Sequence, residues 1–124
     1  MIKSSYNQIA NAKNPYQGKA EKVLCVCSAG LLRSPTIAHV LALKGYNTRA
    51  AGASDEYALI PLSTALVLWA DKIVVVAEQH EAIRVAMAEA GVTTTPVTVL
   101  DIPDNYERMD TELVKIVEEN LSEW

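Results

Sequence analysis

The chain has 124 residues, half of them apolar, and its 11 basic and 15 acidic side chains leave a net charge of -4. This length suits one domain of about 100–200 residues, and the acidic balance argues against general affinity for nucleic acid, which requires clustered lysines and arginines. No apolar run approaches the roughly 20 residues that cross a bilayer, and the polar N-terminal segment lacks the apolar region of a secretory signal. We therefore expect a cytoplasmic domain with no nucleic-acid or membrane partner.

The chain then divides into a polar extension and an alternating α/β domain. Residues 1–21 are rich in polar side chains and turn signals, and we interpret them as an extension outside the domain, which spans 22–124. Continuous apolar runs predict buried strands over 22–27 and 72–77, and we interpret 46–51 and 96–100 as two further strands. A helix is predicted over 34–44, between a Ser-Pro start and Gly45, and apolar residues at helical spacing predict helices over 61–70, 78–90 and 111–121. Asp110 is a candidate N-cap for the last helix. The alternation predicts a three-layer α/β fold in which helices cover both faces of a four-stranded parallel sheet.

The loop after the first predicted strand has the features of a phosphate site. Such sheets bind ligands at the carboxyl ends of their strands, and here small residues and a helix N-terminus can direct backbone N–H groups at an anion. The same field favours a nucleophilic thiolate at Cys27, at the end of the strand. Arg33 offers a planar group that binds two phosphate oxygens at once, and Ser34 is expected to cap the helix, with Pro35 in its first position. The predicted phosphate loop consists of Ser28, Ala29, Gly30, Leu31, Leu32, Arg33 and Ser34.

A second polar loop, residues 101–110, follows the last predicted strand and is expected at the same edge of the sheet. It is the only acidic loop that the predicted layout places there. Asp104 follows Pro103, which restricts the local backbone, and we predict that Asp104 protonates a leaving group, with Asp101 as the alternative acid. Two tyrosines are either rim residues that pack against an aromatic substrate or ordinary half-exposed loop residues: Tyr57 and Tyr106.

Residues 23–35 (VLCVCSAGLLRSP) resemble the signature of the low-molecular-weight protein tyrosine phosphatases, which is a cysteine, five residues and then Arg-Ser-Pro. The similarity extends over most of residues 22–121, and within the family it is greatest to a short subgroup of predicted tyrosine phosphatases with an Asp-Ile-Pro-Asp loop and a nearby Met-Asp. The further similar segments are 51–53 (AGA), 69–71 (WAD), 100–106 (LDIPDNY) and 109–110 (MD).

The resemblance implies a hydrolase of phosphomonoesters that acts through a phosphocysteine intermediate, without a metal or another cofactor. In that interpretation Cys27 is the nucleophile, Arg33 binds the phosphate, Ser34 stabilises the thiolate and Asp104 is the general acid. The implied substrate is a phosphorylated protein or a small aryl phosphate.

The chain departs from the family pattern inside the phosphate loop. Gly30 stands where the family usually has an asparagine whose side chain ties the loop together, which predicts a looser loop and low activity. Leu32 replaces the second cysteine of many members. Cys25 lies two residues before Cys27, so we expect it on the same side of the strand, as a core residue.

Three other functions share parts of this pattern. Cys27-Ser28-Ala29-Gly30 resembles the phosphocysteine loop of the sugar-transport IIB phosphocarriers, although those loops generally lack the arginine. Arsenate reductases of this fold need further cysteines, and none follows Cys27. A catalytically weak protein that binds phosphate or a phosphopeptide is the third alternative.

Overall fold

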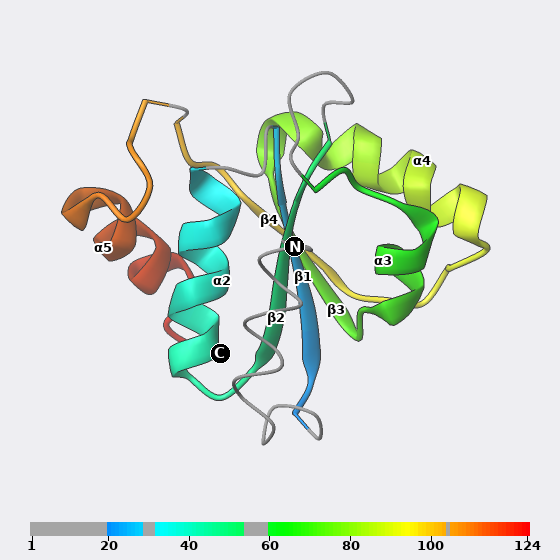
Figure 1. Ribbon diagram of the computed structural model, residues 1–124, viewed down its shortest axis with the longest axis horizontal. Coiled ribbons are helices and arrows are strands. Elements are labelled where there is room, and N and C mark those ends of the chain that lie inside the picture. The colour runs from blue at the N-terminus through cyan, green and yellow to red at the C-terminus, as the bar shows by residue number, and fades with distance from the viewer. Residues whose placement is uncertain (1–19, 29–31, 54–59, 104) are drawn as a thin grey trace, which may run out of the picture.

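Four parallel strands form the middle layer of the protein, and helices cover both faces of the sheet (Figure 1). The computed structural model describes residues 20–28, 32–53, 60–103 and 105–124, so most of the predicted extension falls outside it. The strands in these residues are β1 (Lys22–Cys27), β2 (Asn47–Gly52), β3 (Lys72–Val76) and β4 (Val97–Leu100). The helices are α2 (Arg33–Leu43), α3 (Thr64–Trp69), α4 (His80–Ala90) and α5 (Thr111–Asn120), with a 3₁₀ turn, η2 (Ala77–Gln79), before α4.

The strand order is β2-β1-β3-β4, and each neighbouring pair is parallel. From β1 the chain passes to β2 on one side and then crosses to β3 on the other side. The direction of winding therefore reverses between β1 and β3, which is the point where sheets of this kind bind ligands at their carboxyl ends. The predicted three-layer α/β fold with a four-stranded parallel sheet is confirmed.

The two faces of β1 belong to two separate cores, because successive side chains of a strand point to opposite faces. Val23, Cys25 and Cys27 pack on the side of α2 and α5, whereas Leu24 and Val26 pack on the side of α3 and α4. All five side chains are buried, as expected for a central strand of a sheet that is covered on both faces. The prediction that Cys25 is a core residue on the side of Cys27 is confirmed.

Two helices begin at positions that differ from the prediction. The N-cap of α2 is Leu32, without a side-chain cap, so Ser34 is the second residue of the helix and Pro35 is the third. The predicted capping role of Ser34 is therefore wrong, because its hydroxyl is used in contacts with the sheet. Helix α3 begins three residues later than expected, since Ser63 is its cap and accepts a hydrogen bond from the Leu66 amide.

Asp110 caps α5 by accepting the Glu112 amide at 2.9 Å, as predicted.

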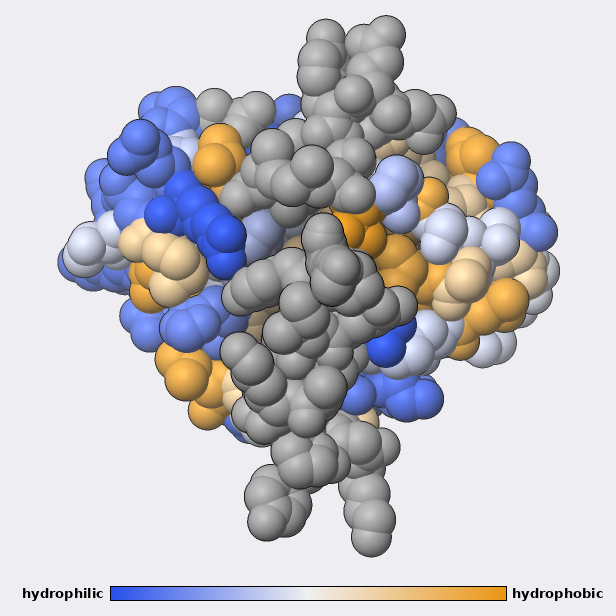
Figure 2. Space-filling view, viewed as in Figure 1, coloured by the Kyte–Doolittle hydropathy of each residue, from blue (hydrophilic) through white to orange (hydrophobic). Residues whose placement is uncertain are grey.

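The two sides of the molecule differ in how much apolar surface they expose. In the space-filling view, hydrophilic residues gather on the side of α5 and hydrophobic residues on the side of α3 (Figure 2). Leu68 of α3 and Val85 of α4 are exposed on that second side. In the part of the chain that the structure describes, no helix combines the length and the apolar character needed to span a membrane.

Candidate active site

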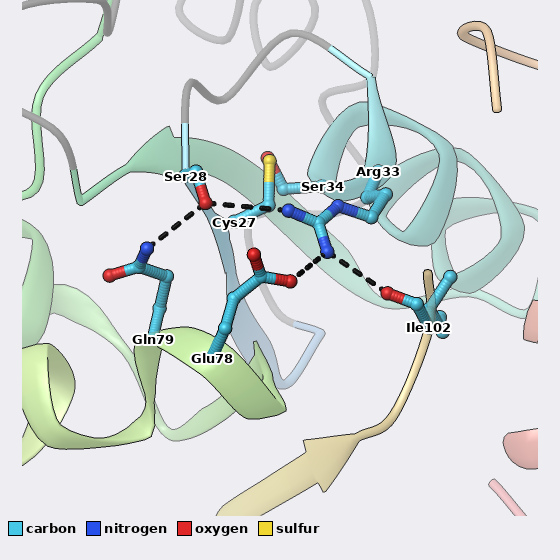
Figure 3. A network of polar contacts seen from close by, with 7 residues as sticks. All are labelled: Cys27, Ser28, Arg33, Ser34, Glu78, Gln79 and Ile102. Atoms are coloured by element: carbon cyan, nitrogen blue, oxygen red, sulfur yellow. Dashed lines mark hydrogen bonds and ion pairs between the residues drawn. The ribbon is translucent and has the colours of Figure 1, made fainter. Parts of the chain in front are cut away.

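Cys27 ends β1 at the carboxyl edge of the sheet, where its side chain is 2% exposed. Its sulfur lies 3.3 Å from the hydroxyl oxygen of Ser34, which in turn lies 3.3 Å from the carbonyl oxygen of Ala51 in β2 (Figure 3). The thiol donates to the hydroxyl, and the hydroxyl donates to the carbonyl. A hydroxyl hydrogen can rotate, so Ser34 can instead donate to the sulfur once the thiol has lost its proton. This arrangement is suited to a cysteine that alternates between thiol and thiolate.

Arg33, the first residue of α2, is buried although it carries a charge. Its Nη1 donates to the carbonyl oxygen of Ile102 at 2.9 Å and forms an ion pair with the Glu78 carboxylate, and its Nη2 lies 3.4 Å from the hydroxyl oxygen of Ser28. Because Ser28 directly follows Cys27, the guanidinium group lies beside the loop that begins at the cysteine (Figure 3). Burial of a charge is costly unless partners compensate it, and here the partners come from the segments after β1, β3 and β4.

The segment after β3 contributes two side chains that the sequence analysis did not identify. Glu78 binds Arg33, and Gln79 Nε2 donates to the hydroxyl oxygen of Ser28 at 3.0 Å (Figure 3). The expectation that residues 101–110 form the only acidic loop at this edge is therefore wrong, since Glu78 brings a carboxylate from η2. The position of Glu78 in the sequence could have indicated its role, because it follows the buried strand 72–76. This strand pairs with β1, so its carboxyl end lies next to Cys27.

The loop after β4 approaches the same site. Ile102 is buried and accepts from Arg33, Asp101 is exposed, and Tyr106 is half-buried against the core on the side of α2 and α5. The predicted acid, Asp104, lies outside the described residues. The same holds for four other predicted site residues, which are Ala29, Gly30, Leu31 and Tyr57. The roles of Asp104 and Asp101 as acids, and of the two tyrosines as rim residues, stay predictions.

The two cysteines are chemically different although they share one side of β1. Both are thiols. Burial raises the pKa of the Cys25 thiol far above its ordinary value, and the neighbouring charge of Cys27 raises it further. Cys25 therefore stays protonated in the interior, and a protonated thiol is a poor nucleophile. Within the described residues, no group of three His, Cys, Asp or Glu side chains comes together in a way that would hold a metal ion.

The fold is that of the low-molecular-weight tyrosine phosphatases, as the comparison with solved structures shows. Wzb of Vibrio vulnificus, solved with benzylphosphonate, has a TM-score of 0.65 and 23% identity over 85% of this chain and 97% of its own. The tyrosine phosphatase Wzb of Escherichia coli K30, solved with phosphate, has a TM-score of 0.62 and 20% identity over 85% of this chain and 96% of its own. Comparisons with protein-family models and with curated proteins give no match.

Proposed function

We propose that this protein is a cysteine-dependent phosphatase of the tyrosine phosphatase type. One observation carries the proposal: Cys27 and the buried Arg33, six residues apart in the sequence, lie at the same edge of the sheet. The Cys27 thiol is also in contact with the Ser34 hydroxyl. The similar Wzb structures hold benzylphosphonate or phosphate. Benzylphosphonate carries a CH₂ group where phenyl phosphate has its ester oxygen, so these ligands support an aryl phosphate, such as phosphotyrosine, as the substrate.

In the proposed first step, the Cys27 thiolate attacks phosphorus in line with the leaving oxygen. A sulfur–phosphorus bond forms while the phosphorus–oxygen bond of the ester breaks, and Asp104 gives its proton to the departing oxygen. Arg33 and backbone N–H groups of the phosphate loop stabilise the charge on the remaining phosphate oxygens. The Nη2 atom of Arg33 lies 3.4 Å from the hydroxyl oxygen of Ser28, at the start of the phosphate loop, so we assign the Nη2 side to the substrate.

The second step releases the enzyme from the phosphocysteine. Asp104, now a carboxylate, takes a proton from water, and the water oxygen attacks phosphorus as the sulfur–phosphorus bond breaks. The sulfur leaves as a thiolate, and the Ser34 hydroxyl, 3.3 Å away, can donate to it. The positive charge that both steps require comes from Arg33 and from the N-terminus of α2.

The test is steady-state release of phosphate from p-nitrophenyl phosphate and from a phosphotyrosine peptide, with and without a chelator. We expect many turnovers per Cys27 thiol, unchanged by the chelator. Cys27→Ser is expected to abolish turnover and to retain inorganic phosphate binding, measured by calorimetry. A single turnover that leaves a stable phosphocysteine would instead indicate a phosphocarrier, and phosphate binding without any turnover would indicate a binding protein.

A further inference from the structure

The Thr36 hydroxyl connects the phosphate loop to the loop that carries the predicted acid. Thr36 is fully buried in the first turn of α2. Its Oγ1 donates at 2.8 Å to the carbonyl oxygen of Leu32, which belongs to the predicted phosphate loop and is the N-cap of α2. The same oxygen accepts the backbone N–H of Met109 at 3.0 Å, 73 residues further along the chain. One hydroxyl thus donates to one loop and accepts from the other, which uses its donor and one of its lone pairs.

The backbone of Met109 is unusual at this contact. Its φ angle is +61°, and among the residues that the structure describes no other non-glycine residue has a positive φ. L-residues adopt this conformation infrequently because the side chain crowds the backbone, and it persists where surrounding contacts determine it. The hydrogen bond to Thr36 is such a contact, since it fixes the direction of the Met109 amide.

The acid loop, residues 101–110, is therefore held near both of its ends by the first turn of one helix. Arg33 binds the carbonyl oxygen of Ile102, and Thr36 binds the amide of Met109. The predicted acid at position 104 lies between these two anchors in the sequence. A general acid acts only within hydrogen-bond reach of the oxygen it protonates, and displacement by about 1 Å can cost about a hundredfold in rate.

We infer that Thr36 is a positioning residue that sets the placement of the acid loop relative to the phosphate loop, and thereby the delivery of the proton to the leaving group. This inference rests on the proposed phosphatase function. The hydroxyl acts through Met109 and Leu32 and does not itself touch the substrate.

Three substitutions test this role. Thr36→Val keeps the shape of the side chain and removes both hydrogen bonds, whereas Thr36→Ser keeps the hydroxyl. Thr48→Val is the matched control, because the Thr48 hydroxyl donates to the Ala38 carbonyl of the same helix at 3.1 Å and has no described bond to the acid loop. Thermal unfolding of each variant separates loss of stability from loss of positioning.

The first measurement is kcat for aryl phosphates whose leaving groups differ in basicity. For Thr36→Val we expect kcat with phenyl phosphate to fall about tenfold more than kcat with p-nitrophenyl phosphate, because a poor leaving group depends most on the proton. Inhibition by inorganic phosphate should change by less than about twofold, since no phosphate contact is lost. Thr36→Ser and Thr48→Val should show the wild-type dependence on the leaving group. An equal loss with both substrates, or weaker phosphate binding with an unchanged leaving-group dependence, would overturn the inference.

The second measurement does not depend on turnover. Amide hydrogen exchange followed by NMR should show that the Met109 amide exchanges at least about fivefold faster in Thr36→Val, the loss expected for one hydrogen bond, and at the wild-type rate in Thr36→Ser. Unchanged exchange in Thr36→Val would refute the connection itself. If the wild-type chain hydrolyses no aryl phosphate, the proposed function fails, and the exchange rates still decide whether Thr36 holds the loop.

Discussion

The Nη1 atom of Arg33 donates to the carbonyl oxygen of Ile102 at 2.9 Å, although 69 residues separate the two in the sequence. This contact joins the start of α2 to the loop after β4. The same nitrogen binds Glu78, so the guanidinium group is held in place without a ligand. A cation whose orientation is already fixed stabilises charge in a transition state without reorganising at that moment. The supports of Arg33 are therefore as relevant to the proposed chemistry as the arginine itself.

Replacement of Glu78 tests the ion pair with Arg33. We expect Glu78→Ala to lower kcat/KM for p-nitrophenyl phosphate by about tenfold, because the guanidinium loses an orienting partner. This magnitude is at the lower end for a charged hydrogen bond, since water screens a half-exposed carboxylate. Glu78→Gln keeps an acceptor and should lose less.

Glu81→Ala provides the control for this prediction. It breaks the exposed ion pair of Glu81 with Arg84 on the same helix, and we expect no change in kcat/KM. Equal activity of Glu78→Ala and the wild-type chain would show that Arg33 keeps its orientation without Glu78.

Replacement of Gln79 tests a support of the phosphate loop. The chain has glycine at position 30, where the phosphatase signature that it resembles usually has asparagine, and the Gln79 amide donates to Ser28 at the start of the loop. We expect Gln79→Ala to weaken inhibition by inorganic phosphate about fivefold, which corresponds to about 1 kcal/mol for one hydrogen bond. Gln79→Glu removes the donor and adds a negative charge, so its loss should be larger. Phosphate inhibition that is unchanged in both variants would mean that the loop keeps its shape without Gln79.

Replacement of the two candidate acids tests the assignment of the proton donor. Asp104→Asn should lower kcat for phenyl phosphate by about a hundredfold, the lower range for loss of a general acid, and kcat for p-nitrophenyl phosphate much less. Asp101→Asn, at an exposed position, should leave both values within about twofold of wild type. The reverse pattern, with an inactive Asp101→Asn and an unaffected Asp104→Asn, would transfer the role to Asp101.

The raised pKa of Cys25 predicts how stability depends on pH. In the unfolded chain this thiol ionises near its ordinary pKa of about 8.5, whereas burial keeps it protonated in the folded protein. Above that pH the folded state binds more protons than the unfolded state, so the free energy of unfolding falls as pH rises. Urea unfolding under reducing conditions at pH 7 and at pH 9.5 measures this decrease. Cys25→Ala should reduce the difference between the two pH values, and an identical difference in both proteins would contradict the prediction.

Much of this protein follows from its sequence alone, because the relevant signals are local. Apolar runs marked β1 and β3, the predicted bounds of all four strands lie within a residue or two of the observed ones, and Asp110 marked the start of α5. The segment from Cys27 to Arg33 identified the candidate site, since a strand, a loop of small residues and a helix N-terminus are contiguous in the chain.

The contacts that hold this site together depend on the tertiary structure. The order β2-β1-β3-β4 places the end of β3 beside Cys27 and so brings Glu78 and Gln79 to the site, and no local pattern determines the order of strands. Ser34 appeared to be a helix cap, because the sequence cannot show that the carbonyl of Ala51 and the sulfur of Cys27 lie within reach of its hydroxyl. Hydrogen bonds between distant segments form only once packing of the sheet and helices has fixed their separation.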